Sequence, residues 1–151
     1  MRGDMKLSTR TRYGLRAVVE MAQLGAWIRG NDASRRVALG SVAEAQKIDP
    51  EYLKQIFVSL RKHGIVRAVQ GRSGGYVIAR APKDVSALDI AEALEEGTAL
   101  VRCVDTPDDC TRTEDCSTHR LWSKVTDQVR RVLAMTTVAR LARECPRKVH
   151  R

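Results

Sequence analysis

The chain has 151 residues, the size of one domain with a short extension, and 43% of them are hydrophobic, which is enough for a core. Its 27 Lys and Arg residues outnumber its 18 Asp and Glu residues, which gives a formal charge of +9. Such a charge suits a polyanionic partner such as nucleic acid, but it is equally typical of a basic surface without such a partner, so the positions of the charges have to decide. Basic residues interrupt the first thirty positions and no stretch reaches the length of a membrane span, so we expect a cytoplasmic protein without signal peptide or membrane partner.

The N-terminal third predicts two helices and a loop. Residues 13–27 are apolar at helical spacing and predict a first, core-facing helix. Residues 28–36 are rich in Gly, Asn, Asp and Arg and predict a loop. Ser41 followed by Glu44 has the pattern of a capping box, which predicts a short helix that continues through Gln46.

A second start signal, Asp49 followed by Pro50, opens a further helix that Gly64 ends. Apolar residues at positions i, i+3, i+4 and i+7 give it one buried face: Leu53, Ile56, Phe57 and Leu60. The free face is polar and basic, and it carries Glu51, Lys54, Gln55, Arg61 and Lys62. Two short helices joined by a tight turn in this way are typical of a helix-turn-helix, and these five side chains are the candidate DNA contacts.

Residues 65–70 and 76–80 are β-branched and aromatic runs that flank Gly71-Arg72-Ser73-Gly74-Gly75. They predict a hairpin with a flexible, basic tip. Its place directly after the second helix indicates the wing of a winged helix, although an ordinary surface hairpin is the alternative. We expect Arg72, Ser73 and Gly74 to contact DNA, because glycines allow the backbone to approach phosphates closely.

The C-terminal half predicts a linker helix, an irregular loop and a long helix. Ser86 and Asp89 form a capping pattern at the start of a helix over 86–96. Residues 101–118 lack periodicity and contain three cysteines and five acids, which predicts a loop. Residues 119–143 contain no proline or glycine, and a largely apolar stripe recurs there every three or four positions: Trp122, Val125, Val129, Val132, Thr136 and Ala139. We interpret this stripe as a dimer seam, with packing on the chain's own domain as the alternative.

The loop and the start of the long helix carry Cys103, Cys110, Cys116 and His119 in the spacing C-x6-C-x5-C-x2-H. Three thiolates and an imidazole complete the ligand shell of tetrahedral zinc or of a 2Fe-2S cluster. Zinc modules usually pair their cysteines as C-x2-C, so the wide spacing favours the cluster. Redox-active thiols without metal are a third possibility.

Other candidate ligands lack companions at ligand spacing. Cys145, His63 and His150 are therefore interpreted as incidental residues. The sequence contains no phosphate-binding loop, nucleophile elbow or paired catalytic constellation, so we do not expect an enzyme.

Several short runs resemble one known family, the Rrf-type winged-helix transcription regulators of bacteria, and within it the members that carry an iron-sulfur cluster. The resemblance spans residues 5–143, and these are the matching runs: Met5–Ser8, Arg12–Tyr13, Tyr52–Phe57, Leu60–Lys62, Gly74–Tyr76 and Cys116–Trp122. It implies that Cys103, Cys110, Cys116 and His119 ligate a 2Fe-2S cluster.

The chain departs from that pattern at several positions. Family members that sense nitric oxide can use an N-terminal carboxylate as a ligand where this chain has Arg12, and a guanidinium cannot ligate iron. The first cysteine gap is six residues, where five is expected of the cluster-binding members. Lys54 replaces a glutamate and Gln70 replaces a wing arginine, so the family's target sequence is not transferred to this chain.

Together these patterns predict a mainly α fold with a small β-hairpin wing. The predicted parts are a winged helix-turn-helix over 5–82, a linker helix over 83–100, a cluster-binding loop over 101–119 and a dimerisation helix over 120–143. The predicted function is iron-sulfur-cluster-dependent regulation of transcription by a homodimer on a double-stranded DNA operator, as repressor or activator of iron-sulfur assembly or stress genes. The alternatives are a small redox or zinc-binding protein that does not act on DNA, and a nitric-oxide-sensing regulator of the same family.

Overall fold

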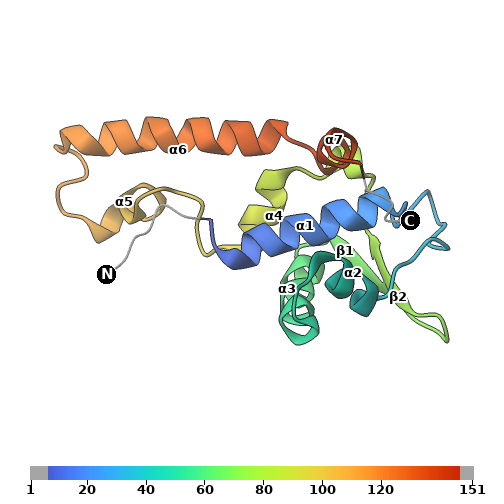
Figure 1. Cartoon of the computed structure of the whole chain (residues 1–151). Coiled ribbons are helices and arrows are strands. Elements are labelled where there is room, and N and C mark those ends of the chain that lie inside the picture. Colours follow the sequence, from blue (N-terminus) through green and yellow to red (C-terminus); the bar gives the residue numbers. More distant parts are fainter. Residues whose placement is uncertain (1–6, 147–151) are drawn as a thin grey trace.

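The fold is a winged helix followed by a long, protruding helix, as seen in a computed structural model that describes residues 7–146 (Figure 1). Met5, Lys6 and His150, which the sequence interpretation used, lie outside the described residues. In chain order the elements are α1 (Thr9–Gln23), α2 (Leu39–Gln46), α3 (Pro50–Lys62), β1 (Val66–Val69), β2 (Gly75–Ile78), the 3-10 turn η1 (Pro82–Asp84), α4 (Ala87–Leu94), α5 (Arg102–Asp105), the 3-10 turn η2 (Pro107–Asp109), α6 (Ser117–Met135) and α7 (Val138–Glu144). The predicted fold class is confirmed.

The first two helices begin earlier than the sequence predicted. Ser8 caps α1 by accepting a hydrogen bond from the Thr11 N–H at 3.2 Å, so the helix runs over Thr9–Gln23 rather than 13–27. The capping box predicted at Ser41 is wrong, because α2 starts at Leu39 and Ser41 already lies inside its first turn. The carbonyl of Ala38 accepts the Ser41 N–H at 3.1 Å instead.

The signals around α3 and the hairpin predicted the structure well. The Asp49 side chain accepts the Tyr52 N–H at 2.8 Å, Pro50 occupies the first helical position, and Gly64 follows the helix with a φ of 67°. The strands β1 and β2 pair antiparallel, with Val66 opposite Ile78. The four apolar residues predicted to face the core from α3 are all buried.

The helix α1 lies at the centre of the core and contacts α2, α3, α4 and α7. Its N-terminus is fixed to the end of α4 by Glu95, whose carboxylate accepts hydrogen bonds from the Ser8 N–H, the Ser8 hydroxyl and the Thr11 hydroxyl at 2.8, 2.7 and 2.5 Å. Burial acts to raise the pKa of Glu95, but the hydrogen bonds from Thr11 and Ser8 outweigh it and hold that pKa below its ordinary value.

The predicted loop over 28–36 leads into an extra pairing beside the wing. Val37 and Tyr76 exchange two backbone hydrogen bonds, of 3.0 and 2.8 Å, and Trp27 forms a parallel bridge with Ile78. The loop is therefore tied to β2 at both of its ends.

Close packing at this extra pairing makes Gly75 intolerant of a side chain. We expect Gly75→Ala to lower the free energy of unfolding by about 1–3 kcal/mol, because a Cβ there would lie 2.5 Å from the carbonyl oxygen of Val37. Gly40→Ala is the matched control, since it adds a Cβ inside α2 with nothing within 4 Å and should be neutral or stabilising by up to about 1 kcal/mol. Urea unfolding midpoints compare the two. Equal midpoints for Gly75→Ala and the unaltered protein would show that the strand pairing is looser than described.

The predicted helix over 119–143 is two helices, with a break at Thr136 and Thr137. The break is caused by a short antiparallel bridge to the segment before α4: the Ala87 N–H donates to the Thr136 carbonyl and the Val138 N–H donates to the Val85 carbonyl, both at 2.8 Å. Thr137 then caps α7 through its hydroxyl. Because α7 packs on α1 and η1 and Val138 is fully buried, Thr136 and Ala139 belong to a junction within the chain.

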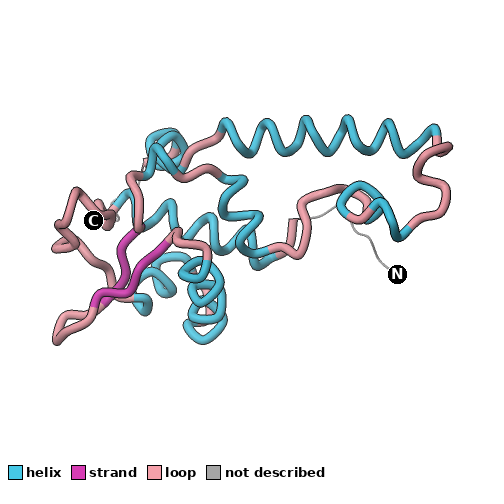
Figure 2. The backbone as a smooth tube through the Cα atoms, turned by 180° about the vertical axis from the view of Figure 1, so that it is seen from behind, coloured by secondary structure: helices cyan, strands magenta, loops and turns pink. Residues whose placement is uncertain are grey.

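The wing and the cysteine-bearing segment lie at opposite ends of the molecule, and α6 extends along one edge between them (Figures 1 and 2). Among residues 7–146 we find no helix with the length and apolar character that a bilayer crossing requires.

Candidate DNA interface and cysteine site

The outer face of α3 is polar and unengaged. Its buried side packs on α1, α2 and α4, which turns the opposite side to solvent. All five polar side chains predicted for this face are exposed: Glu51, Lys54, Gln55, Arg61 and Lys62. Within the described residues none of these five side chains makes a hydrogen bond or ion pair, so their donors and acceptors are available to a partner.

The sequence interpretation missed one member of this face. Val58 is 54% exposed and lies between Gln55 and Arg61 on the outward stripe of α3. An apolar side chain on such a face can contact the methyl group of a thymine. The three-four spacing of the polar stripe includes position 58 and could have identified Val58. It was missed because an apolar residue in an amphipathic helix is ordinarily attributed to the core.

The tip of the wing is exposed and is supported from outside the hairpin. Gly71 adopts a φ of 122° and its carbonyl accepts the Gly74 N–H at 2.9 Å, which shapes the tip that carries Arg72 and Ser73. The guanidinium of Arg36 donates from Nε to the Ser73 carbonyl. The sequence interpretation left Arg36 in a plain loop, because this contact depends on the pairing of Val37 with β2. The remaining guanidinium nitrogens of Arg36 add to the positive charge of the wing.

Two of the four predicted metal ligands are in contact. Cys103 lies on α5 and His119 on the first turn of α6, and the Nδ1 atom of His119 is 3.5 Å from the sulfur of Cys103. The hydroxyl of Ser123, one turn further along α6, donates to the His119 carbonyl and lies 3.5 Å from the Nε2 atom of the same ring.

The other two predicted ligands, Cys110 and Cys116, lie in the segment that connects η2 to α6. Cys110 is exposed, and the sulfur of Cys116 is 3.2 Å from the hydroxyl of Thr118, which lowers the pKa of the Cys116 thiol. In the part of the chain that the structure describes, no three Cys, His, Asp or Glu side chains are close enough together to hold a metal ion. The four donors have the chemistry of a cluster site, and their described positions join only Cys103 and His119.

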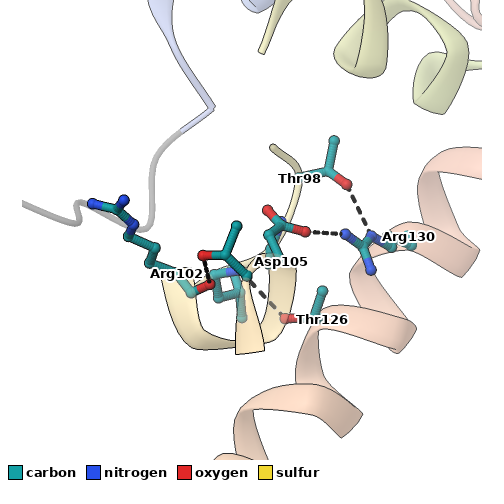
Figure 3. A network of polar contacts seen from close by, with 8 residues as sticks. Thr98, Arg102, Asp105, Thr126 and Arg130 are labelled. Carbon is teal, nitrogen blue, oxygen red and sulfur yellow. Dashed lines mark hydrogen bonds and ion pairs between the residues drawn. The ribbon is translucent and has the colours of Figure 1, made fainter. Parts of the chain in front are cut away.

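A polar network fastens α5 to α6 (Figure 3). The Asp105 carboxylate accepts hydrogen bonds from Arg130 at 2.5 Å and from the Ala99 N–H at 3.0 Å, and Arg130 also donates to the Thr98 hydroxyl at 2.8 Å. The hydroxyl of the fully buried Thr126 accepts the Leu100 N–H at 3.3 Å. Cys103 is therefore held against α6, whereas the residues from 106 to 112 are all exposed.

The side of α6 that faces away from Thr126 carries exposed apolar residues. Leu121, Val132 and Met135 are 52, 64 and 66% exposed, and with Val125 they form a stripe that we call the α6 seam. Their spacing, with position 128 between, alternates by four and three as in a coiled coil. Val125 and Val132 were predicted for the seam, Leu121 and Met135 were missed, and the half-buried Trp122 and Val129 lie at its inner edge.

A helix-turn-helix with an unengaged polar face, a basic hairpin directly after it and a protruding helix define the winged-helix class of DNA-binding regulators. Comparison with known proteins gives the family. Residues 7–144 match the family model of Rrf2, described as an iron-dependent transcriptional regulator. The chain belongs to the Rrf2 family of transcriptional regulators.

Relatives cover nearly the whole chain. Protein rrf2 of Nitratidesulfovibrio vulgaris is 33% identical over 95% of this chain and 93% of its own length. The structure of CymR, the global cysteine regulator of B. subtilis, has a TM-score of 0.72 at 31% identity and covers 93% of this chain and 98% of that one. The structure of IscR from T. potens has a TM-score of 0.67 at 33% identity over 92% and 87% of the two chains.

These relatives confirm the resemblance and the regulator class, and they leave the cofactor open. Because the relatives include a protein described as a cysteine regulator, membership of the family is not by itself evidence that a given member binds a cluster.

Proposed function

We propose that the protein is an iron-sulfur-cluster-dependent transcription regulator that acts in the cytoplasm and binds a double-stranded DNA operator as a homodimer. The observation that carries the DNA part is the unengaged polar face of α3 beside a basic wing. Family membership supports the same reading. Iron-sulfur assembly or stress genes are the proposed targets.

In this proposal α3 enters the major groove with its first turns toward the bases. Glu51, Lys54 and Gln55 read base edges, and Arg61 and Lys62 contact the backbone. Arg72, Ser73 and Gly74 contact phosphate or the minor groove from the wing, and Arg36 holds the carbonyl of Ser73 in place. Two such heads, related by the twofold axis of the dimer, fit a near-palindromic operator.

The proposed ligands of a 2Fe-2S cluster are Cys103, Cys110, Cys116 and His119. When bound, such a cluster supplies a redox-sensitive group that ties the four side chains together. Cys103 and His119 already share a contact that the Asp105–Arg130 pair supports, so the segment with Cys110 and Cys116 is the part that has to close on them. Since α6 begins directly after Cys116, such a closure would act on the start of the helix that carries the α6 seam.

A second candidate is a regulator of the same family that senses through its thiols without a metal. It is favoured by the four free cysteines and by the absence of a gathered ligand group among the described residues. Iron and sulfide assays on the anaerobically purified protein distinguish the two. Stoichiometric zinc without iron would favour the zinc alternative, and a nitric-oxide-sensing cluster protein would contain iron and sulfide as well.

Selection of DNA from a random pool tests the DNA interface. We expect the cluster-loaded protein, the cluster-free protein or both to enrich a near-palindrome whose halves lie about one helical turn, or a multiple of it, apart. Gln55→Ala should reduce the binding free energy on the best operator by about 1–3 kcal/mol and should relax the sequence preference at one base pair. Arg61→Ala should weaken binding to all DNA sequences alike, and it should reduce the slope of the logarithm of the binding constant against the logarithm of the salt concentration by about one.

The matched control is Lys124→Ala, which removes a positive charge from an exposed position on α6. It should leave operator affinity unchanged. Failure of both forms to enrich any motif, or equal losses for Lys124→Ala and Gln55→Ala, would refute the assigned interface.

A further inference from the structure

A pocket of about 470 Å³ lies at the junction of α1, α7 and η1, and its lining includes no residue of α3 and none of the proposed cluster ligands. That volume is within the range of about 300–1,000 Å³ found for small-molecule sites. The lining residues are Ala22, Gln23, Trp27, Ala81, Pro82, Lys83, Ala139, Ala142 and Arg143.

Hydrogen bonds hold the pocket walls together. The amide of Gln23 on α1 donates to the carbonyls of Ala142 and Cys145 at 3.3 and 2.7 Å, which fixes the C-terminal end of α7 to α1. The Val138 N–H donates to the Val85 carbonyl at 2.8 Å and fixes the other end of α7 next to η1. The pocket is therefore preformed by packed elements, and small side chains leave it open.

The lining combines an apolar surface with unpaired positive charge. The alanines, Pro82 and the Trp27 indole form the apolar part, and no carboxylate is among the lining residues. Lys83 and Arg143 are exposed, and within the described residues neither side chain makes an ion pair or hydrogen bond. The guanidinium of Arg29 lies 4.1 Å from the centroid of the Trp27 ring and adds a further positive charge nearby.

We propose that this pocket binds a small organic anion with an apolar body, such as an aryl or branched alkyl carboxylate. The apolar body would fill the space between the alanines and Trp27, and the carboxylate would pair with Arg143 and Lys83. This is a second input besides the cysteines. The pocket touches both the connection that follows β2 and the helix that follows α6, so its regulatory consequence, though not its ligand binding, rests on the proposed function.

Trp27 reports binding directly and without DNA. The chain has two tryptophans, so Trp122→Phe leaves Trp27 as the single indole fluorophore. The probes are 3-phenylpropionate and its neutral amide, 3-phenylpropionamide. We expect saturable quenching or a spectral shift with the acid, and an affinity for the amide that is lower by about tenfold or more.

Variants in the same background separate charge recognition from shape. Arg143→Gln should lower the affinity for the acid by about tenfold and leave the affinity for the amide unchanged. Arg140→Gln, on the same helix but outside the lining, should change neither affinity. Ala139→Leu should fill the pocket and abolish binding of both probes while circular dichroism and the oligomeric state stay unchanged.

Three results of the binding titrations would overturn the proposal. These are absence of saturable binding up to about 10 mM for both 3-phenylpropionate and 4-methylpentanoate, equal affinity for acid and amide, and equal losses for Arg140→Gln and Arg143→Gln. A change of oligomeric state in the correctly folded Ala139→Leu variant, without loss of probe binding, would identify the pocket wall as an interface between protomers and would also overturn it.

Discussion

Replacing any one of Cys103, Cys110 or Cys116 with alanine should abolish the visible absorption and the bound iron of the anaerobically purified protein. The physical reason is that the proposed cluster has four protein ligands, and loss of one thiolate leaves an iron open to solvent and exchange. The described positions make the losses informative, because Cys103 is held near His119 while Cys110 is exposed and belongs to no gathered group of ligands among the described residues. Equal effects at both would show that the intervening segment closes when the cluster binds.

A control variant and a variant of the fourth proposed ligand complete this experiment. Cys145→Ala removes an exposed thiol outside the ligand spacing and should leave absorption and iron content unchanged. His119→Ala should weaken the cluster without erasing it, since water or a neighbouring group can replace one imidazole more readily than a thiolate. Cluster loss in Cys145→Ala equal to that in Cys103→Ala would contradict the ligand assignment.

The sequence predicted those elements whose signals are local. Asp49, Pro50 and Gly64 act through backbone groups within a few residues of themselves, and they marked both ends of α3 correctly. The pair Ser86 and Asp89 likewise forms the predicted capping box of α4. The Ser41 box failed because its residue types also suit the interior of a first helical turn, and the Ala38 backbone already starts that helix.

Features that depend on pairing between distant segments were missed. Nothing near Thr136 in the sequence indicates a helix break, because the break is imposed by hydrogen bonds to Val85 and Ala87, some fifty positions away. The contact of Arg36 with the wing also joins residues that are far apart in the sequence, because Arg36 donates to the carbonyl of Ser73. Periodicity also identified an apolar stripe on α6 but did not separate the side facing Thr126 from the side facing solvent, so the predicted seam combined the two.

The corrected stripe leads to the prediction with the largest expected effect on DNA binding. The α6 seam leaves three large apolar side chains more than half exposed on one side of a protruding helix, a surface that single protomers rarely keep in water. A twofold partner that supplies the same stripe would cover it and would bury Val132 in the contact. Light scattering should then find the unaltered protein dimeric at micromolar concentration.

Val132→Asp should convert that dimer to a folded monomer, because a carboxylate in an apolar seam has no partner and would have to be desolvated. The monomer keeps α3 and the wing but engages one half-site at a time, so its operator affinity should fall by about a hundredfold or more while its affinity for an isolated half-site stays the same. Arg131→Asp is the matched control, since it places the same charge at the adjacent exposed position and should stay dimeric. If the unaltered protein bound its operator as a monomer, the dimer itself would be refuted. Equal dissociation in both variants would place the dimer contact elsewhere than on the α6 seam.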